Sequence, residues 1–352
     1  MHYGESIERL SDFDREGQAQ VLRLYEETGI TRDQDLEALY VLRRDGQIVA
    51  AGGLAGQSLR SLAVAPELEG EGYMALLVSE LQERILQKSP GSPIFIVTKA
   101  SNSKKFISLG FSLVAESKAG EGILPTALLC TPGEAFSLYL RERVQAAEAE
   151  WGENFRRSRQ GALVMNLNPL TRGHLALIDL ALAEQDYVHV FLLSAPESSI
   201  PFATREAILR AVAAKRARLC VHPTGPWLVS RASFPGYFFS GSDEALRSQA
   251  ALDAEIFRLI ALELNLGTRY LGTEPYSHET AIYNEIILQR ARDYAVRLIP
   301  RFTTADGDII SASKVRALLA QADCWQSPDC RAALERYLPP ESIAILTKEN
   351  GE

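Results

Sequence analysis

The sequence predicts an α/β protein made of two consecutive blocks, an α+β block followed by a doubly wound parallel sheet. Two observations predict this class. Residues 1–130 contain several short strand-like runs with one helical pattern between them, whereas from Gly161 onward short apolar runs alternate with helical patterns. Alternating strands and helices are typical of βαβ units, whose strands lie parallel in one sheet. The 352 residues are enough for two ordinary domains.

The first block has three strand-like segments, at residues 39–56, 58–65 and 93–100. The first segment contains Asp45-Gly46 between two apolar runs, which predicts a β-hairpin. A helical pattern follows at residues 74–88. Residues 132–158 are rich in charge and alanine and predict a connecting helix.

The second block begins with "GALVMNL", a continuous apolar run expected of a buried parallel strand. The helices expected after it share an apolar face with a helical period: residues 173–185, 202–215, 281–295 and 310–319. The further strands expected are short apolar runs between those helices: residues 187–195, 217–223, 269–275 and 296–302. The polar residues that follow these strands would gather at one edge of the sheet, where open α/β sheets bind ligands.

Bulk properties exclude several classes of protein. The net charge of -8 disfavours nonspecific nucleic-acid binding. No apolar run approaches the roughly 20 residues of a membrane helix, and the first residues lack the apolar core of a signal peptide. Four scattered cysteines are typical of free thiols in a reducing compartment. We therefore expect a cytoplasmic protein with no nucleic-acid or membrane partner.

The stretch "NPLTRGHLALI" connects the first strand of the second block to its helix. Gly173 allows the backbone to turn closely there, and the helix start offers free N–H groups and a positive dipole end that favour a phosphate. Thr171 adds a hydroxyl and His174 an imidazole N–H. These residues alone equally fit a plain strand–turn–helix with a capping threonine and an incidental histidine.

The stretch "ISASKVRALL" opens a late helix with two hydroxyls and two cations. Ser311 or Ser313 alone would be an ordinary N-cap. Together with Lys314 and Arg316, however, they form a group suited to clamping a polyphosphate.

Taken together, the two stretches resemble the two motifs of the nucleotidyltransferase superfamily. Thr171-Arg172-Gly173-His174 matches [TH]-x-G-H, and residues 310–316 match I-S-x-[ST]-x-x-R. The resemblance implies a Rossmann-like domain in which the histidine and threonine hold the nucleotide phosphates, and the later serines and basic residues hold the β- and γ-phosphates. Arg172 fills the variable position and receives no role.

Neighbouring stretches resemble one family within that superfamily, the citrate lyase ligases. "MNLNPLTRGH" is similar to that family's "MNxNPFTxGH". "VSRASFPGYF", "YLGTEPYSHETAIYNE" and "IPFATR" also resemble segments of the family. This resemblance extends from about residue 160 to the end of the chain.

The family also carries an N-terminal domain that resembles GCN5-related N-acetyltransferases, and residues 59–81 and 101–111 are similar to its central and later elements. The phosphate loop departs from R/Q-x-x-G-x-G/A, because Glu69 replaces the basic or amide residue and Met74 the final small residue. Two carboxylates, Glu69 and Glu71, would repel a pyrophosphate. We therefore expect this domain to pack or to recognise a carrier rather than to bind acetyl-CoA efficiently.

The expected domains are an acetyltransferase-like domain at 1–131, a connecting helix at 132–159 and a nucleotidyltransferase domain at 160–352. The resemblance implies an AMP-forming ligase that activates acetate with ATP and Mg²⁺, then acetylates the prosthetic-group thiol of the acyl carrier protein subunit of citrate lyase. It implies catalytic roles for Thr171, His174 and Arg316. The residues expected to bind the nucleotide are Asn168, Gly173, Thr273, Glu274, Ser311, Ser313 and Lys314.

Four polar positions have competing interpretations. Thr273 and Glu274 end a strand, which favours the ligand edge of the sheet. Arg231 could pair with acetate or phosphate, or could be an ordinary surface arginine. Tyr283 could bind the substrate or simply pack in its helix. No protein ligand for a metal is expected.

Two other functions remain open from the sequence. An adenylyltransferase would make a stable dinucleotide such as dephospho-CoA or NAD, rather than free AMP. A noncatalytic member of a citrate lyase assembly would use its N-terminal domain to bind partners, although intact motif residues argue against that function. Oligomeric state and carboxylate specificity are not predicted.

Overall fold

The computed structural model describes residues 5–194, 198–228, 242–273, 277–304, 306–321 and 327–350. The chain divides into two compact units, each described by itself below. The N-terminal unit comprises residues 1–138 and 233–255, and the C-terminal unit comprises residues 139–232 and 256–352. The return of residues 233–255 to the N-terminal unit was not predicted. The predicted end of the acetyltransferase-like domain at residue 131 and the predicted start of the nucleotidyltransferase domain at residue 160 remain predictions.

The N-terminal unit contains a seven-stranded sheet in the order β1-β2-β3-β4-β5-β7-β6. Its strands are β1 (Glu5–Arg9), β2 (Ala38–Arg44), β3 (Gln47–Ala55), β4 (Ser58–Val64), β5 (Ile94–Lys99), β6 (Ser112–Glu116) and β7 (Thr126–Thr131). Neighbouring strands run antiparallel except β4 and β5, which are parallel. The predicted hairpin at Asp45-Gly46 is confirmed, and both residues have positive φ.

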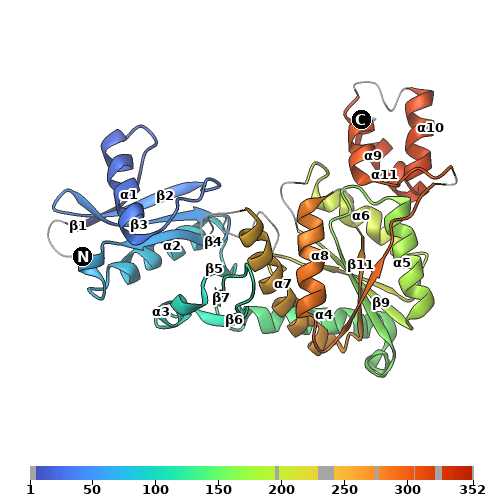
Figure 1. The fold of residues 1–352 in the computed structure, drawn as a ribbon, viewed down its shortest axis with the longest axis horizontal. Helices are drawn as coiled ribbons and strands as arrows, with labels where there is room; N and C mark the ends of the chain where they lie inside the picture. The colour runs from blue at the N-terminus through green and yellow to red at the C-terminus, as the bar shows by residue number, and fades with distance from the viewer. Residues whose placement is uncertain are drawn as a thin grey trace. The chain divides into compact units, whose positions relative to one another are not determined.

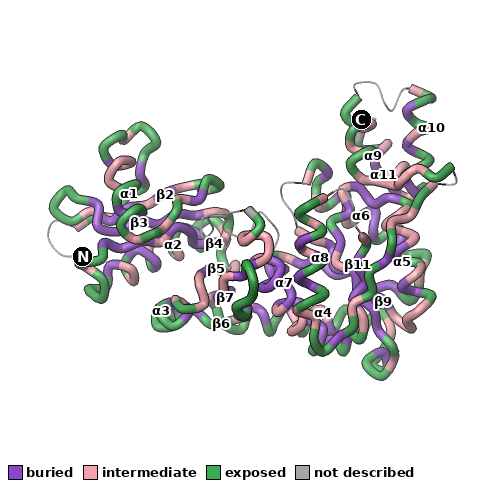
Figure 2. The backbone as a smooth tube through the Cα atoms, viewed as in Figure 1, coloured by how far each residue is buried: buried purple, intermediate pink, exposed green. Residues whose placement is uncertain are grey.

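Helices cover both faces of this sheet (Figure 1). The helical elements of the unit are α1 (Arg15–Thr28), η1 (Pro66–Leu68), α2 (Tyr73–Lys88), η2 (Ala100–Asn102) and α3 (Ser103–Ile107). Helix α1 packs through Val21 and Leu24 against one face, and α2 packs through Leu77 and Leu81 against the other. Strand β3 between them is buried along most of its length (Figure 2).

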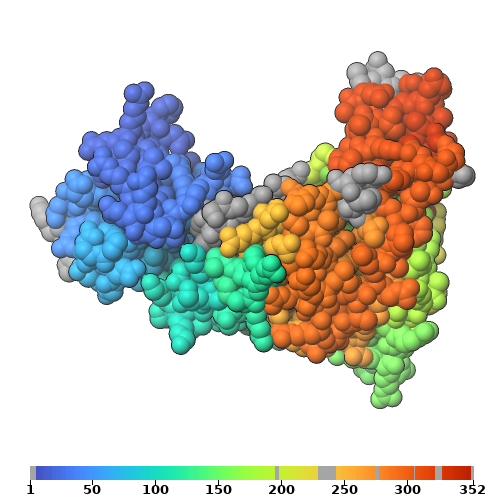
Figure 3. Space-filling model, in the orientation of Figure 1, coloured from blue at the N-terminus to red at the C-terminus, as the bar shows by residue number. Residues whose placement is uncertain are grey.

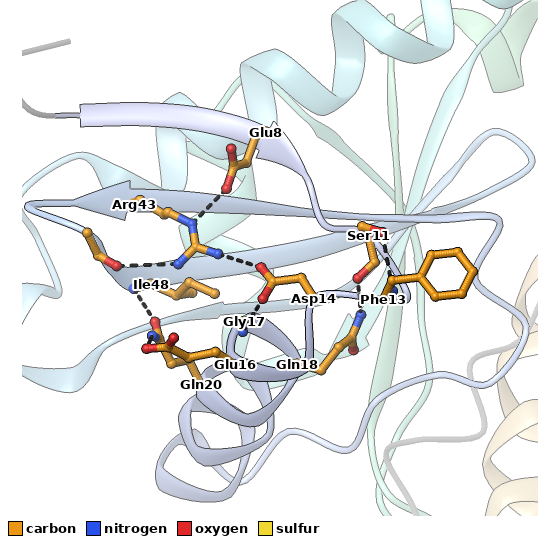
Figure 4. A network of polar contacts seen from close by, with 11 residues as sticks. Glu8, Ser11, Phe13, Asp14, Glu16, Gly17, Gln18, Gln20, Arg43 and Ile48 are labelled. Atoms are coloured by element: carbon orange, nitrogen blue, oxygen red, sulfur yellow. Dashed lines mark hydrogen bonds and ion pairs between the residues drawn. The ribbon is translucent and has the colours of Figure 1, made fainter.

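Arg43 and Asp14 organise the start of α1 (Figure 4). The Asp14 carboxylate accepts a hydrogen bond from the backbone N–H of Gly17, which caps the helix. Arg43 on β2 donates to Glu8 at 2.6 Å and to Asp14 at 3.0 Å, and also to the Gly46 carbonyl. This network joins the hairpin, the first strand and the helix cap within the unit.

The C-terminal unit contains a five-stranded sheet in the order β10-β9-β8-β11-β12, and all its pairs are parallel. Its strands are β8 (Gln160–Met165), β9 (Tyr187–Leu192), β10 (Leu219–Pro223), β11 (Thr268–Gly272) and β12 (Ala295–Ile299). The strand order reverses at β8, so the predicted doubly wound parallel sheet is confirmed. The reversal places the end of β8 beside the end of β11, where ligands bind in such sheets.

The helical elements lying wholly in this unit are η3 (Glu153–Arg157), α5 (Arg172–Glu184), α6 (Phe202–Ala213), α8 (His278–Arg290), α9 (Ala312–Leu319), α10 (Pro328–Tyr337) and α11 (Pro340–Asn350). One face of the sheet packs on α5 and α6, for example through Ile178 and Ile208. The opposite face presents Phe191 to Phe257 at a ring-centroid distance of 6.2 Å. The last helices lie at the surface of this unit (Figure 3, red).

Helices α4 (Ala135–Trp151) and α7 (Ser242–Leu264) have residues in both units. Helix α4 confirms the predicted connecting helix. The expectation of four free thiols is wrong in part: Cys130 and Cys220 are free, but Cys330 is disulfide-bonded. Within the described ranges, we find no helix with the length and apolar character needed to cross a membrane.

Candidate active site

A pocket of about 460 Å³ opens at the carboxyl ends of β8, β11 and β12 in the C-terminal unit. It lies at the edge where the alternation of strands and helices predicted a ligand. The structure brings these predicted site residues together around it: Asn168, Thr171, Gly173, His174, Thr273, Tyr283, Ser311, Ser313 and Arg316. They come from stretches far apart in the sequence, so the sheet edge assembles them.

Helix α5 begins at this pocket with a reciprocal cap. The Thr171 hydroxyl accepts a hydrogen bond from the backbone N–H of His174 at 3.4 Å, and the backbone N–H of Thr171 donates to Nδ1 of His174 at 3.0 Å. Two N–H groups of the helix start are satisfied in this way. The motif residues therefore have a local structural role in addition to any role with a ligand.

The cap also determines the tautomer of His174. Because the Thr171 backbone N–H can only donate, Nδ1 is the unprotonated nitrogen, and Nε2 carries the hydrogen of the neutral ring. Burial, and secondarily the nearby positive charge of Arg301, lower the pKa of His174 to about 4. Nε2 has no hydrogen-bond partner among the described residues. At neutral pH the side chain thus presents an uncharged N–H donor at the pocket.

Helix α9 begins at the same pocket. The Ser311 hydroxyl caps it by accepting from the backbone N–H of Ser313 at 3.2 Å. A Cβ atom built on Gly173 would lie 3.4 Å from Cγ2 of Ile310, so the start of α5 is packed directly against the residue before this cap. The N-termini of α5 and α9 therefore meet at one site, where both favour an anion.

Arg316 joins the two predicted motifs. One terminal nitrogen of its guanidinium donates to the Asn168 carbonyl at 2.7 Å, and the other donates to the Ser313 hydroxyl at 3.0 Å. Lys314, from the same motif, behaves differently: its ammonium is paired with Asp308, and it does not line the pocket. A nucleotide-binding role for Lys314 remains a prediction without support from its position.

Arg301 lines the pocket and was not singled out from the sequence. It follows β12, and its guanidinium donates to the carbonyls of Thr273 and Ile310, each at 3.3 Å. Its backbone N–H donates to the Thr273 hydroxyl at 3.2 Å. Partial burial lowers the pKa of Arg301, although the group remains a cation. A basic residue directly after a strand was the available signal.

Buried side chains behind the pocket hold its loops. Arg205 is fully buried and donates to the carbonyls of Asn166, Leu193 and Ile200 at 2.7 to 3.0 Å. The Asn168 side-chain oxygen accepts from the backbone N–H of Ile200 at 3.1 Å. These contacts fix the loop after β8 against the connection between β9 and α6. Asn168 therefore positions the site as well as lining it.

Tyr283 reaches the pocket from α8, and its hydroxyl accepts from the buried Arg269 at 2.7 Å. The neighbouring Asn284 also lines the pocket and donates to the Gly272 carbonyl at 3.0 Å. Two predicted site residues, Arg231 and Glu274, lie outside the described residues. Their proposed roles remain predictions.

Comparisons with known proteins identify the family of this chain. Residues 160–330 match the family model described as the citrate lyase ligase C-terminal domain. The [Citrate [pro-3S]-lyase] ligase of Haemophilus influenzae is 31% identical over 326 residues, covering 90% of this chain and 91% of that protein. The chain belongs to the citrate lyase ligase family. The corresponding family member of Escherichia coli (strain K12) is 28% identical over 330 residues, covering 90% and 88% of the two chains.

Solved structures similar to part of the chain include Escherichia coli ElaA and an acyl-CoA N-acyltransferase from Pseudomonas aeruginosa. Each covers 36% of this chain and 97% of its own, with 18% and 16% sequence identity respectively and a TM-score of 0.31 in both cases. These TM-scores are below the level from which a shared fold follows.

Proposed function

We propose that this protein is an AMP-forming ligase that activates acetate with ATP and acetylates the prosthetic-group thiol of citrate lyase's acyl carrier protein. Two kinds of observation support the proposal. The chain belongs to the citrate lyase ligase family over about nine-tenths of its length. The pocket joins two helix N-termini, two arginines and a neutral histidine N–H donor. The part of the proposal that concerns the chemical step rests on His174.

In the first half-reaction, an acetate oxygen attacks the α-phosphorus of ATP. The bond from that phosphorus to the bridging oxygen breaks, and acetyl-AMP and pyrophosphate form. Negative charge builds on the α-phosphate oxygens and on the departing pyrophosphate. Such a displacement needs alignment and electrostatic stabilisation, with no covalent intermediate on the protein.

His174 is suited to the α-phosphate. Its cap with Thr171 holds Nδ1 toward the protein backbone, which leaves the Nε2–H for a ligand oxygen. A donor held in this way needs no reorganisation when charge develops. Because the ring is neutral at physiological pH, it stabilises the transition state by a hydrogen bond rather than by an ion pair.

The β- and γ-phosphates are assigned to the start of α9. Ser311 and Ser313 offer hydroxyls there, and Arg316 and Arg301 supply positive charge. Charge-assisted hydrogen bonds to phosphate are about twice as strong as neutral ones. The same residues would then hold the pyrophosphate as it leaves.

Acetate is assigned to the side of the pocket near Tyr283, with Arg231 as the proposed partner of its carboxylate. Thr273 and Glu274 are proposed to contact the nucleotide from the end of β11. The Thr273 hydroxyl already accepts from Arg301, so it couples the ends of β11 and β12 at the site.

Mg²⁺ belongs to the proposal because it would neutralise charge on the phosphates of ATP. The described residues contain no group of three or more His, Cys, Asp or Glu side chains that could hold a metal ion. The donor set of the pocket, hydroxyls and cations, suits phosphate oxygens rather than a metal. No step proposed here uses a protein-bound metal.

In the second half-reaction, the carrier thiol loses its proton and its sulfur attacks the acetyl carbonyl. The bond from that carbon to the AMP oxygen breaks, which gives the thioester and AMP. We place this reaction in the cytoplasm, consistent with the absence of a membrane-spanning helix in the described residues.

The test is to incubate the protein with ATP, Mg²⁺, acetate and deacetylated citrate lyase, and to follow AMP formation together with lyase activity. The proposal expects AMP and restored lyase activity to appear at the same rate. A stable dinucleotide product would instead indicate an adenylyltransferase. The absence of any ATP turnover, with the protein folded, would indicate an assembly protein.

A further inference from the structure

Two sets of polar residues with different chemistry line the candidate active site. The first set offers hydrogen-bond donors or positive charge: His174, Arg301, Ser311, Ser313 and Arg316. The second set comes from α8 and contains no cation: Thr280, Tyr283 and Asn284. Ionised phosphate and carboxylate oxygens can only accept hydrogen bonds, so they belong beside the first set. The chemistry that α8 presents to a ligand is therefore a separate question.

Asn284 lies at the middle of α8, and its side chain has one fixed orientation. The residue is only 7% exposed, and its side-chain nitrogen donates to the Gly272 carbonyl at 3.0 Å. A carbonyl can only accept a hydrogen bond, so the NH₂ group of the amide, and not its oxygen, must face Gly272. The end of β11 thus determines which way the Asn284 amide is turned.

The side-chain oxygen of Asn284 is left as an acceptor. No described residue donates to this oxygen, yet it is not one of the unsatisfied polar atoms that are sealed inside the protein. Because the rest of the side chain is enclosed and Asn284 lines the candidate active site, the accessible surface of the oxygen lies at that pocket. An acceptor in an enclosed site favours a ligand group that can donate to it.

The reactants differ in whether they can supply such a donor. The ionised phosphates of ATP and the carboxylate of acetate cannot, because they would place one acceptor against another. The nucleoside of ATP can, since adenine carries a 6-amino group and ribose carries two hydroxyls. The Asn284 oxygen therefore fits the nucleoside part of the nucleotide rather than its phosphates or the acid.

We propose, on the basis of the proposed function, that Asn284 is a specificity-determining residue whose side-chain oxygen accepts a hydrogen bond from the nucleoside. Gly272 holds the amide in the orientation that makes this contact available. A nucleotide that lacks the donor would leave the enclosed acceptor without a partner, so the site should discriminate against it. The 6-amino group and the sugar hydroxyls share this chemistry.

Three analogues of ATP distinguish the possible donors. Purine riboside triphosphate lacks the 6-amino group, and 2′-deoxy-ATP and 3′-deoxy-ATP each lack one hydroxyl. We expect calorimetry of the intact protein with Mg²⁺ to show at least one analogue binding about tenfold more weakly than ATP. That analogue identifies the donor. If all three bind within about twofold of ATP, the proposal is wrong.

Asn284→Ala separates this role from a structural one. The substitution also releases Gly272, so weaker ATP binding by itself would fit a residue that merely holds the strand end. If the oxygen receives the donor, the variant should bind ATP and the weaker analogue within about twofold of each other, since the contact is already lost. If the variant keeps the full wild-type preference for ATP, Asn284 has only the structural role and the proposal fails.

Gln289→Ala is the matched control. Gln289 is an exposed amide residue on the same helix, donates to Glu285 at 3.0 Å and does not line the pocket. It should keep the wild-type discrimination among the nucleotides. If Asn284→Ala does not fold, the analogue series on the wild-type protein still decides. Failure to bind ATP at all would overturn the proposed function together with this role, whereas ATP binding without discrimination would overturn the role of Asn284 alone.

Discussion

Both units of the molecule place a helix after a strand and a glycine-containing turn, but the two helix starts differ in charge and capping. Before α2, Glu69 and Glu71 are exposed and pair with Lys105 at 3.4 Å and Arg44 at 3.5 Å. The N-cap of α2, Gly72, makes no side-chain hydrogen bond. The turn before α5, residues 166–171, contains no acidic residue and ends in a threonine cap.

The comparison shows that a strand–turn–helix element does not by itself make a phosphate site. A helix N-terminus favours an anion by a modest amount, of the order of 0.3–1 kcal/mol when exposed. Carboxylates in the adjoining turn can cancel that preference, whereas hydroxyls, a neutral N–H and arginines add to it. The start of α5 has the second set of neighbours, and the start of α2 has the first.

The largest effect is expected at the start of α5. His174→Ala removes the proposed N–H donor to the α-phosphate, and loss of one such donor commonly costs about 10²- to 10³-fold in rate. The measurement is kcat for acetate-dependent AMP formation. Circular dichroism and the unfolding midpoint serve as controls, because the substitution also removes half of the helix cap. Turnover at the wild-type rate in a folded variant would contradict the assignment.

Arg316 and Lys314 give a comparison within one motif. Arg316→Ala should weaken ATP binding about tenfold or more, since it removes a charged donor and releases the Asn168 loop. Lys314→Ala should change the dissociation constant by less than about threefold, because its ammonium is already paired with Asp308 and does not line the pocket. Calorimetry with ATP measures both. Equal losses would show that the pairing of Lys314 gives way when nucleotide binds.

The two sequence motifs were predictable because their signals are local. A cap, a turn glycine and a helix start occupy consecutive residues, so both helix starts could be located from the sequence. The ligand roles of Thr171, His174 and Ser311 were implied only by the resemblance of these stretches to the nucleotidyltransferase motifs. The parallel sheet was equally predictable, because the alternation of strands and helices is a pattern along the chain. The position of the polar residues at the sheet edge was predicted from the rule that ligands bind beyond the carboxyl ends of strands.

Arg205, Arg301 and the His189–His222 pair could not be assigned in this way. Arg205 lies within a helix, and its burial depends on carbonyls from two strand ends. The role of Arg301 depends on its contacts with Thr273 and Ile310. The two histidines lie on adjacent strands and meet only through the register of the sheet. These are tertiary relations, and the only local signal among them is the position of Arg301 just after a strand.

The pH dependence of the reaction gives a third, smaller effect. The pKa of His174 in the folded protein is about 4, below its usual 6.5, so the ring stays neutral at pH 6. We expect kcat to change less than about twofold through His174 between pH 6 and pH 8. A histidine with an unperturbed pKa would be only about one-quarter neutral at pH 6. A fourfold fall in kcat at pH 6 that disappears in His174→Gln would contradict the assigned neutral state.

The same shift affects stability in a defined direction. Between pH 6.5 and pH 4 the unfolded chain binds a proton at His174 that the folded protein does not bind. The contribution of this group to the free energy of unfolding is therefore complete above pH 6.5 and is lost as the pH falls toward 4. The contribution of His174 is measured by the unfolding midpoints of wild type and His174→Gln at pH 7.5 and pH 5. Between these two pH values, the midpoint of the wild type should fall by more than that of His174→Gln.

The smallest effect is expected at the start of α2. We expect no acetyl-CoA binding in the micromolar range, which would correspond to about -8 kcal/mol. Replacing Glu69 and Glu71 by glutamine should strengthen any residual binding about threefold per charge at low salt, and the gain should fade as salt rises. Glu80→Gln, in α2 and paired with Arg84, is the matched control and should have no effect. Micromolar binding by the wild-type protein would mean that Lys105 and Arg44 neutralise the two carboxylates well enough for a pyrophosphate, and that the contrast between the two helix starts does not lie in their charge.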